Sequence, residues 1–256
     1  MREFAVDLLQ VNIFETRAEM GIAAARATAD ALRKAIAVRG EANIMFASSP
    51  SQSDLYLALS RENVDWSKVN AFHMDEYAGV GIDDDASFAG YVRKYLFSCL
   101  PPLKNIFFMN GKAEDLDAEC ARYARLLLEH PLDITCAGIG ENGHMAFNDP
   151  YIADLFEPNQ MKINACLDPE CRVQQVRDGW FPDLEHVPEK ALTVTLPGLM
   201  RAPRMVVTVP GATKTESVRR CLDEPICRGV PASALRLHRG AELYIDEVAA
   251  AALKKR

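Results

Sequence analysis

The strongest constraint on the fold of this chain is a regular alternation of strand-like and helix-like segments. Short apolar runs that predict buried strands lie at 43–47, 69–74, 105–109, 133–137, 205–209 and 243–246. Apolar residues recur at helical spacing between them, at 17–38, 54–60, 87–96, 115–129 and 214–222. This alternation predicts an α/β fold with a mostly parallel sheet and helices on both faces.

The domain organisation is expected to be simple. The 256 residues show no shift in composition, no Gly/Ser-rich linker and no repeat, so we expect a single domain over 1–256 with a modified Rossmann-like sheet. The stretch 151–190 lacks clear periodicity, and its four prolines exclude a long helix. Loops of that length are often lids, and we expect a lid there.

Charge and cysteine content exclude several classes of protein. A net charge of −7 disfavours a nucleic-acid-binding surface, although a local pocket can still be positive. No apolar run is long enough to span a membrane, and Glu3 and Asp7 interrupt any signal peptide. The seven cysteines are scattered without a C-x-x-C motif, so we expect neither a disulfide framework nor a metal site. A reducing cytoplasm is the expected location.

Polar residues follow four of the predicted strands. They are the serine-rich segment 48–53, Asp75 with its two neighbours, the Gly-rich turn 138–144 and the segment 210–214. Ligands of open α/β sheets bind beyond the carboxyl ends of the strands, so these segments should meet at one crevice. Their hydroxyl, carboxyl, imidazole and amino groups suit a phosphorylated polyol and proton-transfer chemistry.

Two residues are candidates for proton transfer. Asp75 ends a strand and could be a general base, or it could simply cap the next segment. The side chain of the adjacent Glu76 should point in a different direction from that of Asp75, and we expect it to support the site structurally rather than to contact the substrate. His144 follows the Gly-rich turn and is either a catalyst or a packed core residue; Asn142 and Asp149 flank it and could fix its tautomer.

Candidate phosphate ligands come from the other segments. Ser49 and Ser51 could hold a phosphate near a helix N-terminus or form an ordinary polar turn. Lys214 lies in the first turn of a predicted helix, where a cation is unfavourable unless an anion is bound. Arg172 has no clear role from its own context.

The turn 138–143 matches the pattern G-x-G-x-x-G, which is compatible with a dinucleotide site or with a sharp turn. Pro150 prevents the long helix that such a site needs at this point, and no acidic residue closes a second strand at the required spacing. Gly140 and Gly143 are therefore expected to let the backbone turn and approach a ligand closely. We expect no nicotinamide and no other cofactor.

Two longer motifs carry a family resemblance. HMDEYAGV (73–80) and GIGENGHMAFNDP (138–150) resemble the glucosamine-6-phosphate deaminase (isomerase) family. Weaker similarities lie in register at 110–123, 171–175, 187–200 and 209–214. The related 6-phosphogluconolactonases usually have Asp-Glu-Arg at the first motif and Gly-His-Thr-Ala-Ser at the second. Tyr77 and the run His144-Met145-Ala146-Phe147 are closer to the deaminases.

The resemblance implies a cofactor-free isomerisation of glucosamine 6-phosphate that releases ammonia and gives fructose 6-phosphate. It assigns Asp75 as the base that moves a proton between C2 and C1, and His144 as the residue that assists ring opening. Asn142 and Asp149 would orient His144. A proton alpha to a carbonyl or iminium is acidic enough for a carboxylate to remove.

The resemblance also makes Arg172 and Lys214 phosphate ligands, but the chain departs from the family in the phosphate loop. The usual Gly-Gly-Thr-Pro is replaced within 48–53, which removes two glycines. Beside the histidine, the usual glutamate is Asp149 and a common aspartate is Asn142. The segment 151–163 lacks the basic pattern of an allosteric N-acetylglucosamine 6-phosphate site, so we expect no activation by that effector.

Two alternatives stay open at this level. One is another phosphosugar enzyme on the same scaffold, either an isomerase for a different amino-sugar phosphate or a lactonase. The other is a sugar-phosphate sensor without turnover, which the altered loop 48–53 would suit. In each case the expected ligand is a small phosphosugar, with no nucleic-acid or membrane partner. The sequence is compatible with a homo-oligomer.

Overall fold

The computed structural model describes residues 1–254 and is built around an eight-stranded sheet. Across the sheet the strand order is β1-β2-β11-β10-β7-β3-β4-β6, and every neighbouring pair is parallel except β1 with β2. The strands are β1 (Arg2–Val6), β2 (Leu9–Phe14), β3 (Ala42–Phe46), β4 (Val69–His73), β6 (Asn105–Phe107), β7 (Ile134–Ala137), β10 (Arg204–Val209) and β11 (Ala241–Asp246).

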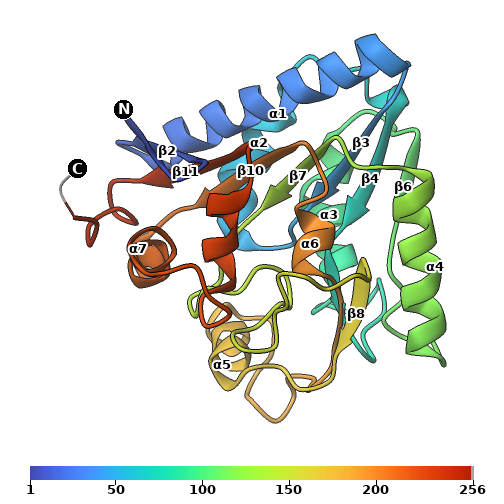
Figure 1. Cartoon of the computed structure of the whole chain (residues 1–256). Helices are drawn as coiled ribbons and strands as arrows, with labels where there is room; N and C mark the ends of the chain where they lie inside the picture. The colour runs from blue at the N-terminus through green and yellow to red at the C-terminus, as the bar shows by residue number, and fades with distance from the viewer. Residues whose placement is uncertain (255–256) are drawn as a thin grey trace.

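Helices cover both faces of this sheet (Figure 1). The α-helices are α1 (Arg17–Arg39), α2 (Ser53–Leu59), α3 (Phe88–Tyr95), α4 (Leu116–Glu129), α5 (Pro169–Arg177), α6 (Leu196–Leu199) and α7 (Thr215–Asp223). The 3₁₀ turns are η1 (Pro50–Gln52), η2 (Trp66–Lys68), η3 (Phe97–Cys99), η4 (Ala212–Lys214) and η5 (Pro231–Leu237). The predicted mostly parallel α/β fold is therefore confirmed.

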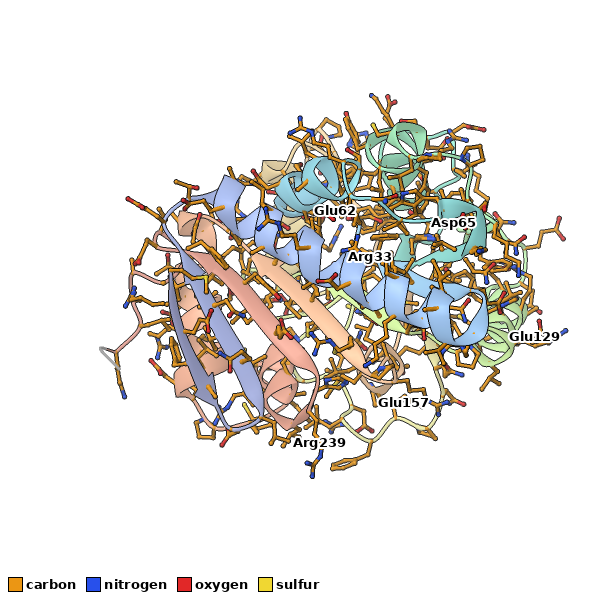
Figure 2. All side chains as sticks on the ribbon, turned by 90° about the horizontal axis from the view of Figure 1, so that it is seen from above. Arg33, Glu62, Asp65, Glu129, Glu157 and Arg239 are labelled. Atoms are coloured by element: carbon orange, nitrogen blue, oxygen red, sulfur yellow. The ribbon has the colours of Figure 1, made fainter. Side chains whose placement is uncertain are left out.

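Alternation along the strands divides the core into two layers. Ile44 and Phe46 of β3 belong to the cluster packed under α1 and α2, whereas Met45 belongs to the cluster packed under α4 and α7. Successive side chains of a strand point to opposite faces, so a fully buried parallel strand supplies both layers. Figure 2 shows α1 crossing the strands, with Arg33 directed towards Glu62 at 3.4 Å.

The longest helix has the ends that its sequence predicts. Thr16 and Glu19 form a reciprocal capping box at the start of α1, and Gly40 ends it with a φ of 80°. Ser87 likewise accepts from the Gly90 N–H at the start of α3, as expected of an N-cap. No helix within residues 1–254 combines the length and apolar character needed to cross a bilayer.

A second, three-stranded antiparallel sheet was not expected. It contains β5 (Asp75–Tyr77), β9 (Ala191–Val194) and β8 (Met161–Asn164), in the order β5-β9-β8. β5 follows β4 after one residue, and Asp75 pairs with Thr193. Asp75, the first candidate catalytic residue, therefore lies on a hydrogen-bonded strand of this second sheet, beyond the edge of the main sheet.

Two further parts of the fold escaped sequence analysis. The hairpin of β1 and β2 at the N-terminus was not predicted. The stretch 151–190 was expected to be irregular, but it contains β8 and the nine-residue α5. Pro169 is the first residue of α5, where proline lacks only an N–H that would have no partner in the helix. The prolines thus limit helix length here without excluding a helix.

Candidate active site

One cavity opens at the carboxyl edge of the main sheet and collects the four predicted strand-end segments. From these segments it is lined by Ser48, Ser49, Ser51, Met74, Asp75, Gly138, Ile139, Gly140, His144 and Lys214. The opposite wall contains Gln174, Gln175, Asp178 and Trp180. Candidate catalytic groups far apart in sequence therefore face the same space, as the geometry of a parallel sheet requires.

Asp75 presents an unpaired carboxylate to this cavity. Its side chain is only 6% exposed, and within residues 1–254 no group donates a hydrogen bond to it. Burial, reinforced by the nearby charge of Glu76, raises the pKa of Asp75 well above its usual value. A carboxylate that is desolvated and free of donors has the properties of a general base.

Glu76 points away from its neighbour, as alternation along β5 requires. Its carboxylate accepts hydrogen bonds from the Ser87 hydroxyl and from the backbone N–H groups of Tyr77, Phe88 and Ala89. It therefore stabilises the N-terminus of α3, although burial still raises its pKa to about 7. Its contacts make Glu76 a structural anchor for β5 and thus for Asp75.

The turn after β7 orients the His144 imidazole. The Asn142 amide donates to Asp168 at 3.1 Å, which leaves its Oδ1 2.8 Å from His144 Nδ1. This arrangement makes Nδ1 the donor and leaves the Nε2 lone pair free. Burial, together with the positive charge of Lys214, lowers the pKa of His144 to about 4, so the ring is neutral near pH 7.

Two glycines make room for that ring. A Cβ atom on Gly140 would overlap three atoms of the His144 imidazole, so the ring lies directly on the Gly140 backbone. Gly143 has a φ of 93°, in the region that glycine adopts without strain. No helix starts within 138–150. The glycines therefore serve a sharp turn, as expected, and the helix that a dinucleotide site requires is missing.

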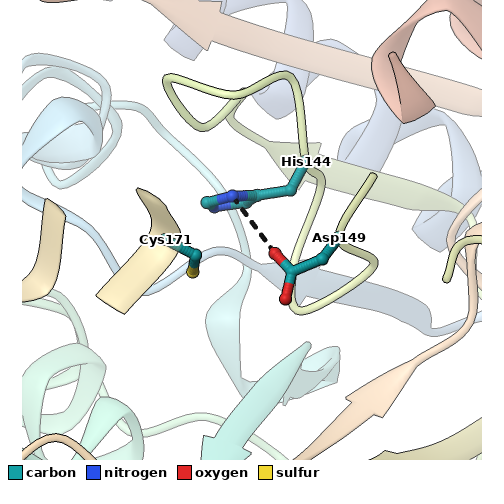
Figure 3. Close-up of side chains that lie close together, drawn as sticks. All are labelled: His144, Asp149 and Cys171. Carbon is teal, nitrogen blue, oxygen red and sulfur yellow. Dashed lines mark ion pairs between the residues drawn. The ribbon is translucent and has the colours of Figure 1, made fainter. Parts of the chain in front are cut away.

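Asp149 lies close to His144 without bonding it directly. Its Oδ2 accepts from Asn164 at 2.9 Å and from the Asp168 N–H at 3.0 Å, while Oδ1 is 3.6 Å from His144 Nδ1 (Figure 3). Burial raises the pKa of Asp149 to about 6. The direct partner of the imidazole is thus the Asn142 amide rather than the Asp149 carboxylate.

Lys214 supplies a cationic side chain to the lining of the cavity. It lies in η4, directly before α7, and its side chain is buried with no ion pair to any residue of 1–254. Burial lowers the pKa of Lys214. A buried ammonium group without a counter-ion is the feature expected of an anion-binding lysine.

The serine segment forms the wall beside this lysine. The Ser49 and Ser51 hydroxyls are 3.0 Å apart, and Gln52 donates to Ser51 at 3.2 Å. Ser48, which sequence analysis did not single out, has a buried hydroxyl without a hydrogen-bond partner. Its position, separated from the end of β3 by one residue, was the signal that could have identified it.

Arg172 is not brought into the cavity. Its guanidinium donates to the backbone carbonyls of Leu184 and Val187, at 2.8 and 2.9 Å. Gln174 and Gln175 of the same helix line the cavity, whereas Arg172 does not. The structure therefore gives no geometric support to the phosphate-binding role implied by the family resemblance.

Aromatic packing holds the turn that follows α5 against α3. The Trp180 ring contacts Phe88 and Tyr91, each at a centroid distance of 5.2 Å. Sequence analysis missed Gln174 and Gln175 because it did not predict α5, and it missed Asp178 and Trp180 because they follow that helix in a stretch without clear periodicity. Movement of this segment as a lid stays a prediction.

Comparison with known proteins places the chain in a family. A family model described as glucosamine-6-phosphate isomerases/6-phosphogluconolactonase matches residues 15–244. The chain belongs to this family. The resemblance inferred from the two motifs is therefore confirmed.

Curated relatives in this family include two deaminases at similar identity. Glucosamine-6-phosphate deaminase of Enterococcus faecalis is 32% identical over 212 residues, covering 81% of this chain and 86% of the relative. Glucosamine-6-phosphate deaminase 1 of Bacillus subtilis is 32% identical over 248 residues, covering 94% and 98%.

Solved structures confirm the fold. A monomeric glucosamine-6-phosphate deaminase superposes with a TM-score of 0.84 at 32% identity, covering 94% of this chain and 98% of that one. A 6-phosphogluconolactonase of Shewanella baltica gives a TM-score of 0.73 at 18% identity, covering 95% and 97%. The second likeness extends to the fold alone.

Proposed function

We propose that this protein is a glucosamine-6-phosphate deaminase that converts glucosamine 6-phosphate and water into fructose 6-phosphate and ammonia. The observation that carries the proposal is that the Asp75 carboxylate and the His144 imidazole line one cavity, together with the unpaired Lys214 ammonium. The curated deaminase relatives support the same reading. No observation favours the lactonase alternative over it.

The residues can be assigned to successive steps. The free Nε2 of His144 accepts the proton of the C1 hydroxyl and returns it to the ring oxygen as the bond between C1 and that oxygen breaks, which gives the open-chain aldehyde. Asp75 then removes the C2 proton, giving an enolamine, and returns it to C1. The resulting imine at C2 is hydrolysed by water to the ketone, with release of ammonia. The proton that O1 gains as C1 becomes a carbinol balances the proton that the amino group at C2 loses in forming the imine.

The phosphate is proposed to lie between Lys214 and the serine segment. The Ser48 hydroxyl lacks a partner and the Lys214 ammonium lacks a counter-ion, so each can donate to a phosphate oxygen without breaking an existing bond. Pro50 has no N–H to offer, so hydroxyl groups replace the backbone donors that glycines would supply.

The proposal is tested by incubating the purified protein with glucosamine 6-phosphate and measuring ammonia and fructose 6-phosphate. We expect equimolar formation of both. Hydrolysis of 6-phosphogluconolactone without ammonia release would favour the lactonase. Thermal stabilisation by sugar phosphates with no product would favour the sensor.

Replacement of Lys214 by alanine should raise KM. Loss of one charge-assisted hydrogen bond of about 1.5–3 kcal/mol corresponds to about 10–150-fold. Steady-state kinetics of Lys214→Ala measure the change, with Lys68→Ala as a surface control paired only with Asp65. The same assay on Arg172→Ala tests the phosphate-binding role implied by the family; an unchanged KM there would agree with its contacts to backbone carbonyls. An unchanged KM in Lys214→Ala would contradict the proposed phosphate position.

As the pH is lowered, activity should begin to fall at an unusually high pH for an aspartate-dependent reaction. Asp75 acts as a base only when ionised, and burial raises its pKa above the usual value. His144, with a pKa of about 4, stays neutral through this range and does not set the limit. A profile of kcat/KM against pH should therefore show its acid limb well above the aspartate range. A plateau that continues down to about pH 4, where ordinary aspartates titrate, would contradict this assignment.

N-acetylglucosamine 6-phosphate should leave turnover unchanged. The segment 151–163 offers only Lys162 as a basic residue, and its ammonium already donates to the Ile152 carbonyl at 3.3 Å. The measurement is the initial rate at subsaturating substrate with and without the effector. A rise in rate would show that an allosteric site exists.

The cellular location and the oligomeric state of the enzyme are also proposals. All seven cysteines are free, and a cytoplasmic location stays the expectation drawn from their spacing. The formation of a homo-oligomer likewise stays a prediction. In contrast, a similar deaminase of known structure is monomeric.

A further inference from the structure

A cluster of potential metal ligands lies beside the cavity. His144, Asp149 and Cys171 are all buried, and one ligand atom from each lies within 4.8 Å of the others (Figure 3). His144 and Asp149 come from the segment after β7, and Cys171 comes from α5. We infer that these three side chains form a binding site for a zinc-like divalent transition-metal ion, which inhibits the enzyme by occupying the His144 imidazole.

The spacing of the ligand atoms fits such an ion. His144 Nδ1 and Asp149 Oδ1 are 3.6 Å apart. A nitrogen and an oxygen that each lie about 2.1 Å from a tetrahedral zinc ion are separated by about 3.4 Å. The thiol, bound at about 2.3 Å, would be about 3.6 Å from each of them. Because the ligand atoms now lie within 4.8 Å of one another, the cluster needs only a small contraction to hold the ion.

An orphaned oxygen points into this cluster. Asp149 is fully buried, and its Oδ1 has no hydrogen-bond partner, whereas Oδ2 is satisfied by two donors. A buried carboxylate oxygen without a partner is costly, and a bound cation would remove that cost. Asp149 therefore has a free coordination position facing His144.

The chemistry of the donors selects the metal class. A thiolate, an imidazole nitrogen and a carboxylate oxygen are the ligand types that zinc uses, whereas magnesium and calcium prefer oxygen alone. On binding, the Cys171 thiol releases its proton to solvent, and the two negative ligands balance the charge of the ion. The ion and its ligands together then carry no net charge, which keeps the desolvation free energy of the buried site small.

The imidazole must change tautomer when it binds the metal. Its Nδ1 proton moves to Nε2, and the Asn142 Oδ1 that accepted this proton, 2.8 Å from the same nitrogen, becomes available as a fourth ligand. Access is open because His144 lines the cavity. The inhibitory part of the inference rests on the proposed function, since a metal-bound imidazole with a protonated Nε2 cannot accept the substrate proton; the binding part does not.

Cobalt(II) titration of the metal-free protein tests the site directly. We expect a thiolate-to-cobalt absorption band that saturates at one ion per chain, and at least tenfold weaker binding without the band in Cys171→Ser. Cys166→Ser, which removes an exposed cysteine, is the matched control and should keep the band. Absence of the band in the wild type, or its persistence in Cys171→Ser, would overturn the inference.

Two further measurements keep the test decisive. X-ray absorption of the zinc-loaded wild type should show one sulfur ligand at about 2.3 Å among nitrogen and oxygen ligands, and needs no variant that might fail to fold. A shell of nitrogen and oxygen alone would overturn the site. If the wild type has deaminase activity with a chelator and loses it with zinc, inhibition is supported; zinc-insensitive activity rejects it. A protein that binds metal but never turns over would reject only the proposed function.

Discussion

Asp75→Asn should lower kcat for glucosamine 6-phosphate by about 10²–10⁴-fold, the contribution typical of a positioned general base. The amide keeps the shape of the side chain and cannot accept the C2 proton. Phosphate binding is left intact, so KM should change little. Incorporation of solvent deuterium into the product, followed by NMR, should fall in parallel with turnover.

The same variant should be more stable than the wild type at alkaline pH. Because burial raises the pKa of Asp75 in the folded state, the ionised carboxylate destabilises the fold above that pKa, and this cost vanishes below the unfolded pKa. The Tm of Asp75→Asn should exceed that of the wild type at pH 8 and match it near pH 3. Asp178→Asn, at the exposed mouth of the cavity, is the control. Near-normal turnover in Asp75→Asn would remove Asp75 from the mechanism.

Gly140→Ala should lower kcat/KM by about 10²-fold or more, because misplacing a catalytic group by about 1 Å can cost that much. The new Cβ would overlap the imidazole ring of His144, so the ring must move away from the Gly140 backbone. The loss should appear mainly in kcat, since the phosphate contacts at Lys214 are untouched. Steady-state kinetics and the Tm of the variant measure the two effects separately.

Gly81→Ala is a matched control for that substitution. A Cβ at Gly81 would meet only the flexible side chain of Lys112, which can move aside. Its activity should therefore stay near that of the wild type. Normal activity in Gly140→Ala would mean that His144 tolerates displacement, and would contradict its role in ring opening.

Most of the main sheet could be predicted from the sequence because its strands are buried on both faces. Continuous apolar runs such as 43–47 and 205–209 contrast sharply with the amphipathic helices between them, and each was found within a few residues. The strands of the second sheet are three or four residues long and mix polar with apolar side chains. Their pairing depends on partners distant in sequence, which no local pattern reveals.

The residues of the candidate site were likewise only partly predictable from the sequence. Asp75, His144 and Lys214 could be named because each follows a recognisable strand. Arg172 could not be placed in the same way, because its direction depends on the helical face of α5, in a stretch where no helix was expected. The choice of Asn142, rather than Asp149, as the direct partner of the imidazole depends on a difference between 2.8 and 3.6 Å.

The sequence by itself determined the order of six strands of the main sheet and of the helices between them, the family, and the residue types available for proton transfer and phosphate binding. These follow from periodicity and from motifs that are local in the chain. Only the tertiary structure decided which of those residues share a cavity, which are deprived of water, and which ones bond to one another. Burial and hydrogen-bond geometry depend on contacts between segments that are distant in the sequence. Because of these contacts, the Asp75 carboxylate is unpaired, the His144 ring is neutral and the Lys214 ammonium has no counter-ion.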